Sequence, residues 1–147
     1  MLGKKKMKTE IKKNIDNIDW NKVSALFESV GWGRRDPDKL KRAFKSSQVV
    51  VFILSAGNLI GIGRALTDFE FYATIFDVIV LPEYQGNGYG RMIIENLLKP
   101  LQGLRFVHLT SMPDKVEFYK KFEFRKQKTA MVIMEDPSSE FAEKILE

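Results

Sequence analysis

The sequence predicts one α/β layered domain built around a mixed β-sheet. Segments rich in β-branched and aromatic residues alternate along the chain with segments whose apolar residues recur at helical spacing. With 147 residues, of which 44% are hydrophobic, the chain has the usual size of one domain and enough apolar side chains for one core. We therefore expect a single domain over residues 1–147, with a basic, flexible N-terminus at 1–6 and an acidic tail at 136–147.

A short strand and two helices are predicted in the first third of the chain. Residues 7–15 alternate weakly between polar and apolar side chains, which predicts the strand. Asp19 is a suitable N-cap for a helix over 20–30, where apolar residues recur at helical spacing. Asp36 comes directly before a proline, the usual order of an N-cap and a first-turn residue, so a second helix should begin there.

Three strands come next and should form the centre of the sheet. The run 49–54 is continuously β-branched or aromatic, and turn residues at 56–58 join it to a strand at 59–67. A second turn at 68–70 leads to the strand 73–81, which is the strongest strand pattern in the chain. Its length and composition predict a central strand covered on both faces.

The remainder of the chain alternates between helical and extended patterns. A glycine-rich loop at 82–90 precedes a helix at 91–98, and a short strand is expected at 104–109. An amphipathic helix at 114–122 and a last strand at 130–134 complete the order, and the acidic tail can form a short helix.

The residue types that the chain lacks exclude several kinds of chemistry. It has no cysteine, which excludes disulfides, thiolate metal ligands and a thiol nucleophile. Its one histidine, His108, excludes a multi-histidine metal site, so no metal is expected. A reaction catalysed here should therefore begin from an activated substrate. No apolar run approaches the roughly 20 residues that span a bilayer, and no secretory signal is present, so we expect a cytoplasmic protein without a membrane partner.

The formal net charge of +5 is concentrated near the N-terminus. Six lysines lie within the first thirteen residues: Lys4, Lys5, Lys6, Lys8, Lys12 and Lys13. A solvated terminus is the simpler interpretation of such a run. An arm that binds nucleic acid is the alternative, but no aromatic residues interleave with these lysines as a stacking surface requires. Nucleic acid is therefore not expected as a partner.

The loop Gln-Gly-Asn-Gly-Tyr-Gly at 85–90 connects the strongest strand to a helix and suits an anion. Backbone N–H groups converge in such a turn, and the helix dipole adds about half a positive charge. The alternative is a turn without a ligand. A Walker loop is excluded because no Gly-Lys-Ser/Thr triplet follows. A dinucleotide fingerprint is excluded because one residue, and not two, separates Gly88 from Gly90.

The pattern that fits is Gln/Arg-x-x-Gly-x-Gly/Ala, which Gln85, Gly88 and Gly90 satisfy. Together with the preceding strand, the segment 77–91 resembles the acetyl-CoA signature of the GNAT superfamily of N-acetyltransferases. The order of predicted elements is similar to that fold over roughly residues 7–135. The resemblance implies a GNAT-like domain with a mixed, mostly antiparallel sheet that splays at the acetyl-CoA site, and with helices on both faces.

Residues 75–91 and the triplet Glu117-Phe118-Tyr119 are most similar to a bacterial and plastid branch that includes arylalkylamine-type acetyltransferases. The resemblance places Tyr119 at the position where members of this family carry a tyrosine that can protonate the departing thiolate. A homodimer is also implied, because partner subunits often cover the exposed sheet edges of such domains.

The resemblance further implies a binding site for the coenzyme. The backbone of Val78, Ile79 and Val80 would lie beside the pantetheine arm of acetyl-CoA. The loop around the pyrophosphate would comprise Gln85, Gly86, Asn87, Gly88, Tyr89, Gly90 and Arg91.

Acetyl-CoA is a thioester, so a free amine can attack it without an enzyme nucleophile. An alkylammonium with a pKa of about 10.4 is neutral in only about one molecule in 2,500 at pH 7, so a base or a water path should accept a proton. The family position for a catalytic glutamate in histone-type members is here Thr74, which cannot serve. Asp77 lies in the same strand and is the candidate base. Its alternative role is that of a strand-end carboxylate bonded to neighbouring backbone or facing solvent.

Several other residues allow two interpretations. Asp68 and Glu70 can attract a cationic amine, whereas His108 in its predicted strand is interpreted as structural. The alternative role of Tyr119 is that of a core aromatic of its helix. The chain also departs from the family pattern, because Pro113 and Met112 replace a common asparagine and Glu123 replaces the glycine of a Gly-Phe pair, which would reduce coenzyme contacts on this side.

The sequence thus favours an N-acetyltransferase that moves the acetyl group of acetyl-CoA to a primary amine, either a small amine or a protein amino group. The alternative is a non-catalytic acyl-CoA-binding or regulatory domain of the same fold, which the threonine at position 74 and the missing asparagine motivate. Trp32, Arg34 and Arg35 can shape the acceptor pocket or form a solvated loop. No motif identifies the amine.

Overall fold

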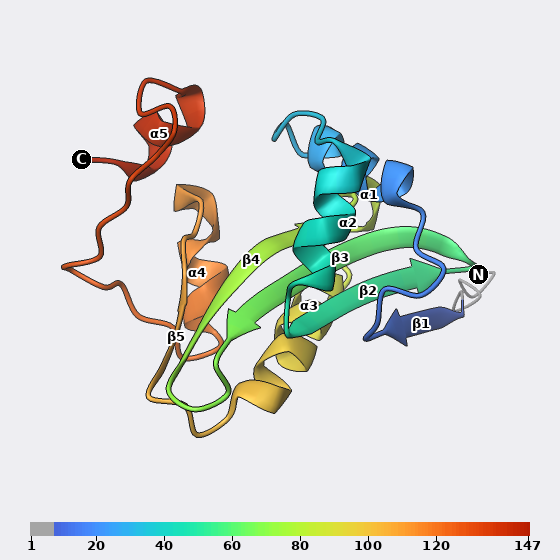
Figure 1. The fold of residues 1–147 in the computed structure, drawn as a ribbon, viewed down its shortest axis with the longest axis horizontal. Helices are drawn as coiled ribbons and strands as arrows, with labels where there is room; N and C mark the ends of the chain where they lie inside the picture. Colours follow the sequence, from blue (N-terminus) through green and yellow to red (C-terminus); the bar gives the residue numbers. More distant parts are fainter. Residues whose placement is uncertain (1–7) are drawn as a thin grey trace, which may run out of the picture. The chain divides into compact units, whose positions relative to one another are not determined.

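The structure is a computed structural model that describes residues 8–147 (Figure 1). The chain forms two compact units, a first one that ends at Leu109 and a second one that spans Thr110–Glu147. The basic N-terminus predicted at 1–6 lies outside the described residues. The assignment of residues 1–147 to one acetyltransferase domain stays a prediction.

The first unit contains a five-stranded sheet in the order β1-β2-β3-β4-β5. Its strands are β1 (Thr9–Lys12), β2 (Val49–Ser55), β3 (Asn58–Thr67), β4 (Tyr72–Val80) and β5 (Phe106–Leu109). The first three pairings are antiparallel and β4 pairs with β5 in parallel. The predicted fold class, an α/β fold with a mixed and mostly antiparallel sheet, is therefore confirmed.

Of the three helices of the first unit, the first two begin where local sequence signals predict them, and the third begins at Tyr89, before the predicted start at position 91. The three helices are α1 (Trp20–Ser29), α2 (Pro37–Lys45) and α3 (Tyr89–Leu98). The carboxylate of Asp19 accepts hydrogen bonds from the first-turn amides of α1, and Asp36 does the same for α2. Backbone hydrogen bonds from Lys39 and Asp38 lower the pKa of the Asp36 carboxyl group.

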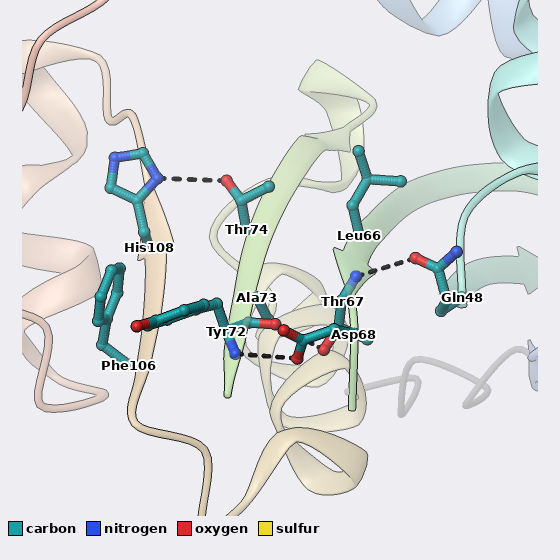
Figure 2. Close-up of a pocket in the computed structure, with 9 residues that line it drawn as sticks. All are labelled: Gln48, Leu66, Thr67, Asp68, Tyr72, Ala73, Thr74, Phe106 and His108. Carbon is teal, nitrogen blue, oxygen red and sulfur yellow. Dashed lines mark hydrogen bonds between the residues drawn. The ribbon is translucent and has the colours of Figure 1, made fainter. Parts of the chain in front are cut away.

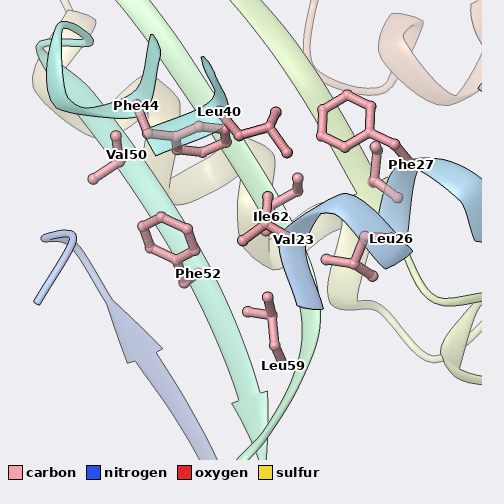
Figure 3. Packing of buried hydrophobic residues seen from close by; sticks show 10 residues of the cluster. Val23, Leu26, Phe27, Leu40, Phe44, Val50, Phe52, Leu59 and Ile62 are labelled. Carbon is pink, nitrogen blue, oxygen red and sulfur yellow. The ribbon is translucent and has the colours of Figure 1, made fainter. Parts of the chain in front are cut away.

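Helices α1 and α2 cover one face of the sheet (Figure 1). Their apolar side chains form a core with those of β2, β3 and β4; its members are Val23, Leu26, Phe27, Leu40, Phe44, Val50, Phe52, Leu59, Ile62 and Ile79 (Figure 3). Aromatic rings join the layers, because Phe44 of α2 lies 5.4 Å from Phe52 of β2 between ring centroids, and Trp20 contacts both.

Helix α3 covers the opposite face (Figure 1). It presents the buried residues Ile93, Ile94 and Leu97. A Cβ atom built on Gly63 of β3 would lie 2.6 Å from Cγ2 of Ile93 and 2.9 Å from Cδ1 of Leu97. Glycine at this position therefore lets α3 approach the sheet closely. This close packing holds α3 in position, and the predicted loop lies at the N-terminus of this helix.

The second unit contains two short helices, α4 (Val116–Lys120) and α5 (Glu140–Ile145). A 3-10 turn, η3 (Pro113–Lys115), precedes α4, so the predicted helix at 114–122 is shorter than expected. The strand predicted at 130–134 is wrong, since these residues form neither helix nor strand. Met131 and Ile133 are 97% and 101% exposed, so the alternating apolar pattern has no covering partner within the described chain.

Candidate functional site

The predicted anion-binding loop forms an open corner between β4 and α3. After the 3-10 turn η1 (Pro82–Tyr84), the chain passes through Gly86 and Gly88, whose φ angles are 78° and 87°. Such angles disfavour any residue with a Cβ atom. A Cβ atom built at either glycine meets no other atom within 4 Å, so side chains do not fill this corner. An anion can therefore approach the main chain here.

Two polar side chains of the loop bind the loop's own backbone. Nε2 of Gln85 donates to the carbonyl oxygen of Val80 at 2.9 Å, which ties the loop to the end of β4. Nδ2 of Asn87 donates to the carbonyl oxygens of Tyr84 and Gln85, both at 3.1 Å. These amides shape the loop, and contact with a ligand is left mainly to the backbone.

The start of α3 is the electropositive end of a ten-residue helix. Gly88 is its N-cap, and the N–H of Met92 donates to the carbonyl oxygen of Gly88 at 3.0 Å. The amides of Tyr89 and Gly90 precede this first helical hydrogen bond. Arg91 lies in the same turn and its exposed guanidinium pairs with Glu95 at 3.2 Å. The predicted loop residues are thus brought together around one helix end.

Strand β4 has an open edge next to this corner. Its parallel pairing with β5 ends at Ile75 and Leu109, whereas β4 continues to Val80. No other described strand pairs with this edge beyond Ile75. The predicted pantetheine-binding residues Val78, Ile79 and Val80 all lie in this part of β4. Their backbone is therefore adjacent to the edge at which the two strands part.

A β-bulge interrupts β4 at the same place. Ile62 of β3 pairs with Ile79, and two residues later Arg64 pairs with Phe76, so Asp77 and Val78 together stand opposite one residue of β3. Asp77 has a φ angle of 57°, in the left-handed region that residues with a side chain rarely adopt. The bulge therefore changes the direction of the β4 backbone beside its open edge.

Asp77, the candidate base, is engaged in an ion pair. Its Oδ2 lies 2.7 Å from Nε of Arg64, and the two side chains are 18% and 17% exposed. The guanidinium also donates from Nη1 to the hydroxyl of Ser47 at 3.3 Å. It lies over the rings of Phe44 and Phe76, at 5.6 Å and 5.3 Å from their centroids. The carboxylate of Asp77 is therefore paired with a guanidinium that other contacts hold in place.

Tyr119, the candidate proton donor, belongs to α4 in the second unit. Its ring packs against Phe118 at 5.1 Å and Phe124 at 5.9 Å between centroids. Burial raises the pKa of the Tyr119 phenol from 10.0 to about 12. The phenol therefore stays protonated at neutral pH, as a donor must, and its aromatic contacts agree equally with a packing role.

Sequence reasoning missed a hollow of about 560 Å³ at the other end of β4 (Figure 2). It is lined by the ends of β2, β3, β4 and β5, through Gln48, Leu66, Thr67, Asp68, Tyr72, Ala73, Thr74, Phe106 and His108. Thr74 and His108 are opposite each other in the parallel pairing of β4 and β5. Because they are far apart in sequence, no local signal could have joined them.

The hollow combines aromatic walls with a few polar groups (Figure 2). The rings of Tyr72 and Phe106 lie 4.9 Å apart between centroids. Oγ1 of Thr74 lies 3.2 Å from Nδ1 of His108. Oδ1 of Asp68 accepts hydrogen bonds from the backbone of Phe71, Tyr72 and Glu70 at 2.7, 3.0 and 2.9 Å, and these bonds lower the pKa of Asp68. This carboxylate therefore remains an anion.

The described residues contain neither a group of metal ligands nor a membrane-spanning helix. Among residues 8–147, no three His, Asp or Glu side chains are grouped so that they could hold a metal ion. No helix in this part of the chain has the length and apolar character needed to cross a membrane.

Three comparisons agree on one family. The family model described as "Acetyltransferase (GNAT) family" matches residues 17–124. The uncharacterized N-acetyltransferase ycf52 of Porphyra purpurea is 35% identical over 119 residues, covering 77% of this chain and 68% of that protein. Serotonin N-acetyltransferase 2, chloroplastic, of Oryza sativa subsp. japonica is 32% identical over 120 residues, covering 78% of this chain and 60% of that protein.

Among solved structures, a GNAT family acetyltransferase from Streptococcus pneumoniae TIGR4 has a TM-score of 0.72 and 24% identity, covering 88% of this chain and all of that one (100%). At this level of identity the likeness concerns the fold. The chain therefore shares both a sequence pattern and a fold with acetyltransferases, and it spans 60% to 68% of the length of the two curated relatives described above.

Proposed function

Since the chain belongs to the acetyltransferase (GNAT) family and is therefore an acyltransferase enzyme, we propose that it transfers the acetyl group of acetyl-CoA to a primary amine. The acceptor is a small amine or a protein amino group, and it attacks the thioester directly. The observation that carries this proposal is the open corner at Gly86 and Gly88 beside the free edge of β4.

We propose that the corner holds the pyrophosphate of the coenzyme. The first-turn amides and the positive end of α3 suit two linked phosphates. The residues proposed to contact the coenzyme are Val78, Ile79, Val80, Gln85, Gly86, Asn87, Gly88, Tyr89, Gly90 and Arg91. Val78, Ile79 and Val80 offer backbone groups along the edge of β4. The extended pantetheine arm of the coenzyme can lie along this edge in the way that an added strand would.

In the proposed reaction the amine nitrogen attacks the carbonyl carbon of the thioester. A C–N bond forms, the C–S bond breaks, and the electron pair of that bond goes to sulfur. The proposed donor to the thiolate is the phenol of Tyr119, which is protonated at neutral pH because burial raises its pKa to about 12. The sequence-based candidate for the base that receives the amine proton is Asp77.

Two observations support a small amine with an aromatic part among the possible acceptors. The hollow at Tyr72 and Phe106 has aromatic walls and an anionic carboxylate at Asp68. The name of the rice relative refers to serotonin, an aromatic amine, although this chain spans 60% of that protein. The proposed acceptor class therefore includes arylalkylamines.

One observation favours a second candidate function, a non-catalytic acyl-CoA-binding domain. The carboxylate of Asp77 is held by Arg64 at 2.7 Å, so the candidate base is already engaged by another side chain. Such a domain would bind acetyl-CoA and release no thiol with any amine in a broad panel, which separates it from the enzyme.

We also propose a homodimer and a cytoplasmic location. The exposed apolar residues Met131, Val132 and Ile133 would be covered by a second copy of the chain. The name of the rice relative places that protein in the chloroplast, so the location of the present chain requires its own measurement, such as microscopy of a tagged protein in its native cells.

The proposal is tested with the variant Gly88→Ala. A Cβ at a φ of 87° strains the loop and obstructs the corner, so the affinity for acetyl-CoA should fall about tenfold in calorimetry. Gly103→Ala is the matched control, because Gly103 has a φ of 83° and equally open surroundings but lies outside the loop. Wild-type protein should bind acetyl-CoA and release free thiol when an amine is added. Absence of acetyl-CoA binding at millimolar concentration would refute the proposal.

A further inference from the structure

We propose that the hollow lined by Tyr72, Thr74 and His108 receives the acceptor amine, and that His108 is the general base, with Thr74 as its positioning residue. This inference rests on the proposed function, because it assigns the acceptor side of the same reaction. It replaces the sequence-based interpretation of His108 as a structural residue.

The first support is the position of the pair along β4. Thr74 and His108 form the pair directly before Ile75 and Leu109, after which β4 and β5 no longer pair. They therefore stand at the vertex of the opening. The free part of β4, residues 76–80, is about 16 Å long at 3.3 Å per residue. A coenzyme arm that follows this edge from the loop points its thioester toward Thr74 and His108.

The second support is that the hollow lies on a free part of one sheet face. Thr74 is opposite Leu66 in β3, and residues opposite each other in a ladder share a face. On β3 this face also carries Ile62, which is buried under α1 and α2. The helices thus cover one end of the face, and the other end forms the hollow. An acceptor can enter here without displacing core side chains.

The third support is the hydrogen bonding of the imidazole. When Oγ1 of Thr74 accepts from Nδ1–H of His108, the lone pair of Nε2 is available to take a proton. Figure 2 shows this second ring nitrogen pointing away from Thr74. Within the described chain, Nε2 has no hydrogen-bond partner. By contrast, the carboxylate of Asp77 is already paired with Arg64.

The charges around the hollow suit an alkylammonium ion. Asp68, at the rim, is held as an anion by three backbone N–H groups. Asp68, Tyr72 and His108 are its titratable lining residues, and no lysine or arginine lines it. An incoming cation is therefore attracted at the rim and can then lose a proton to His108 inside.

The proposed step is balanced. One proton of the bound ammonium moves to Nε2 of His108, and the neutral nitrogen attacks the thioester carbon as described above. When the C–S bond breaks, the phenol proton of Tyr119 goes to the departing sulfur, and the second proton that the nitrogen loses on forming the amide passes to the tyrosinate and restores the phenol. The proton held by His108 then leaves to solvent as the product departs.

The experiment compares two acceptors of equal shape and different basicity, 2-phenylethylamine and O-benzylhydroxylamine. The alkoxyamine nitrogen is largely neutral at pH 7 and does not need a base to lose a proton before attack. His108→Ala should lower kcat for 2-phenylethylamine about 100-fold or more, while the loss for O-benzylhydroxylamine should stay below about tenfold. Equal losses with both acceptors would overturn the inference.

Further variants distinguish a role of His108 as the general base from a purely structural role. His108→Gln preserves most of the side-chain volume and can still bond to Thr74, so it tests the same selective loss if the alanine variant unfolds. Thr74→Val should lower kcat for 2-phenylethylamine about tenfold, and Thr74→Ser should restore it. If Asp77→Asn, and not the His108 variants, produced the loss that depends on acceptor basicity, Asp77 would be the base and the inference would be wrong.

A binding measurement completes the test. His108 is the sole histidine of the sequence, so its ring signals in NMR spectra are unambiguous. Adding 2-phenylethylamine should shift them, and unchanged signals at saturating amine would overturn the acceptor site. If wild-type protein released no thiol with any amine, the proposed function would fail and this inference with it. Turnover by wild type with equal losses in the His108 variants would refute the inference alone.

Discussion

The half-buried phenol of Tyr119 leads to one prediction about catalysis and one about stability. As a proton donor it should give Tyr119→Phe a turnover about 100-fold lower, with little change in acetyl-CoA affinity. Because burial raises its pKa to about 12, the phenol is protonated throughout pH 7–10 and the ratio of wild-type to variant turnover should be constant there. Steady-state rates measured across this range check the prediction, and an unchanged rate in the variant would remove the donor role.

The same shift predicts a difference in stability at high pH. The pKa of the phenol is about 12 in the folded protein, against 10.0 for a tyrosine side chain in water. The contribution of the neutral phenol to the free energy of unfolding is therefore fully present below pH 10, and it is lost as pH rises toward 12. Wild type should therefore lose stability relative to Tyr119→Phe between these values. Urea unfolding of both proteins at several pH values measures this difference, and parallel curves would contradict it.

At the residue scale, the sequence predicted the backbone geometry of the glycine loop but not the side-chain partners that the sheet brings together. Gly86 and Gly88 could be recognised because a turn with positive φ angles has a local signature. The partner of Asp77 could not, since Arg64 is brought to it by the pairing of β3 with β4. The same holds for His108, whose bond to Thr74 depends on the register of two strands joined by a helix.

The close packing of α3 against the sheet leads to a prediction at the scale of secondary-structure elements. Gly63→Ala should destabilise the protein by about 1–3 kcal/mol, because the new methyl group meets the stiff Cγ2 branch of Ile93 at 2.6 Å. If α3 moves outward, the loop at its N-terminus moves with it and acetyl-CoA affinity should fall as well. Chemical unfolding and calorimetry measure the two effects.

A double-mutant cycle identifies the cause of this loss. Ile93→Ala removes the branch that the new methyl group would meet, so the double variant should be more stable than the sum of the two single losses predicts. Additive losses would show that the contact between Gly63 and Ile93 does not position the helix.

Elements with strong local signals could be predicted, and those that depend on a partner could not. Asp19 and Asp36 are N-caps as expected, because a cap is decided by a few neighbouring residues. The strand expected at 130–134 is absent because alternation indicates only that a segment could be paired. Pairing also requires a neighbouring strand, which the sequence does not specify.

At the scale of the whole molecule, the exposed segment at Met131–Ile133 makes the oligomeric state testable. If a second copy covers this segment, Ile133→Lys should convert a dimer to a monomer in light-scattering measurements at micromolar concentration. Gln127→Lys is the matched control, since it adds the same charge at a nearby exposed position without removing apolar surface. A wild-type protein that is already monomeric would refute the proposed homodimer.

The bulge in β4 has a consequence for sequence comparison within the family. Thr74 and Ile79 lie on the same face of the sheet although one position is even and the other odd, because Asp77 and Val78 together occupy one step of the ladder. Deleting one of these two residues would remove the bulge and leave Ile79 opposite Ile62, on the same face as Thr74. Aligning β4 with a strand that lacks the bulge therefore requires a one-residue gap at Asp77 or Val78, and an ungapped alignment would superpose inward-facing positions on outward-facing ones beyond this point.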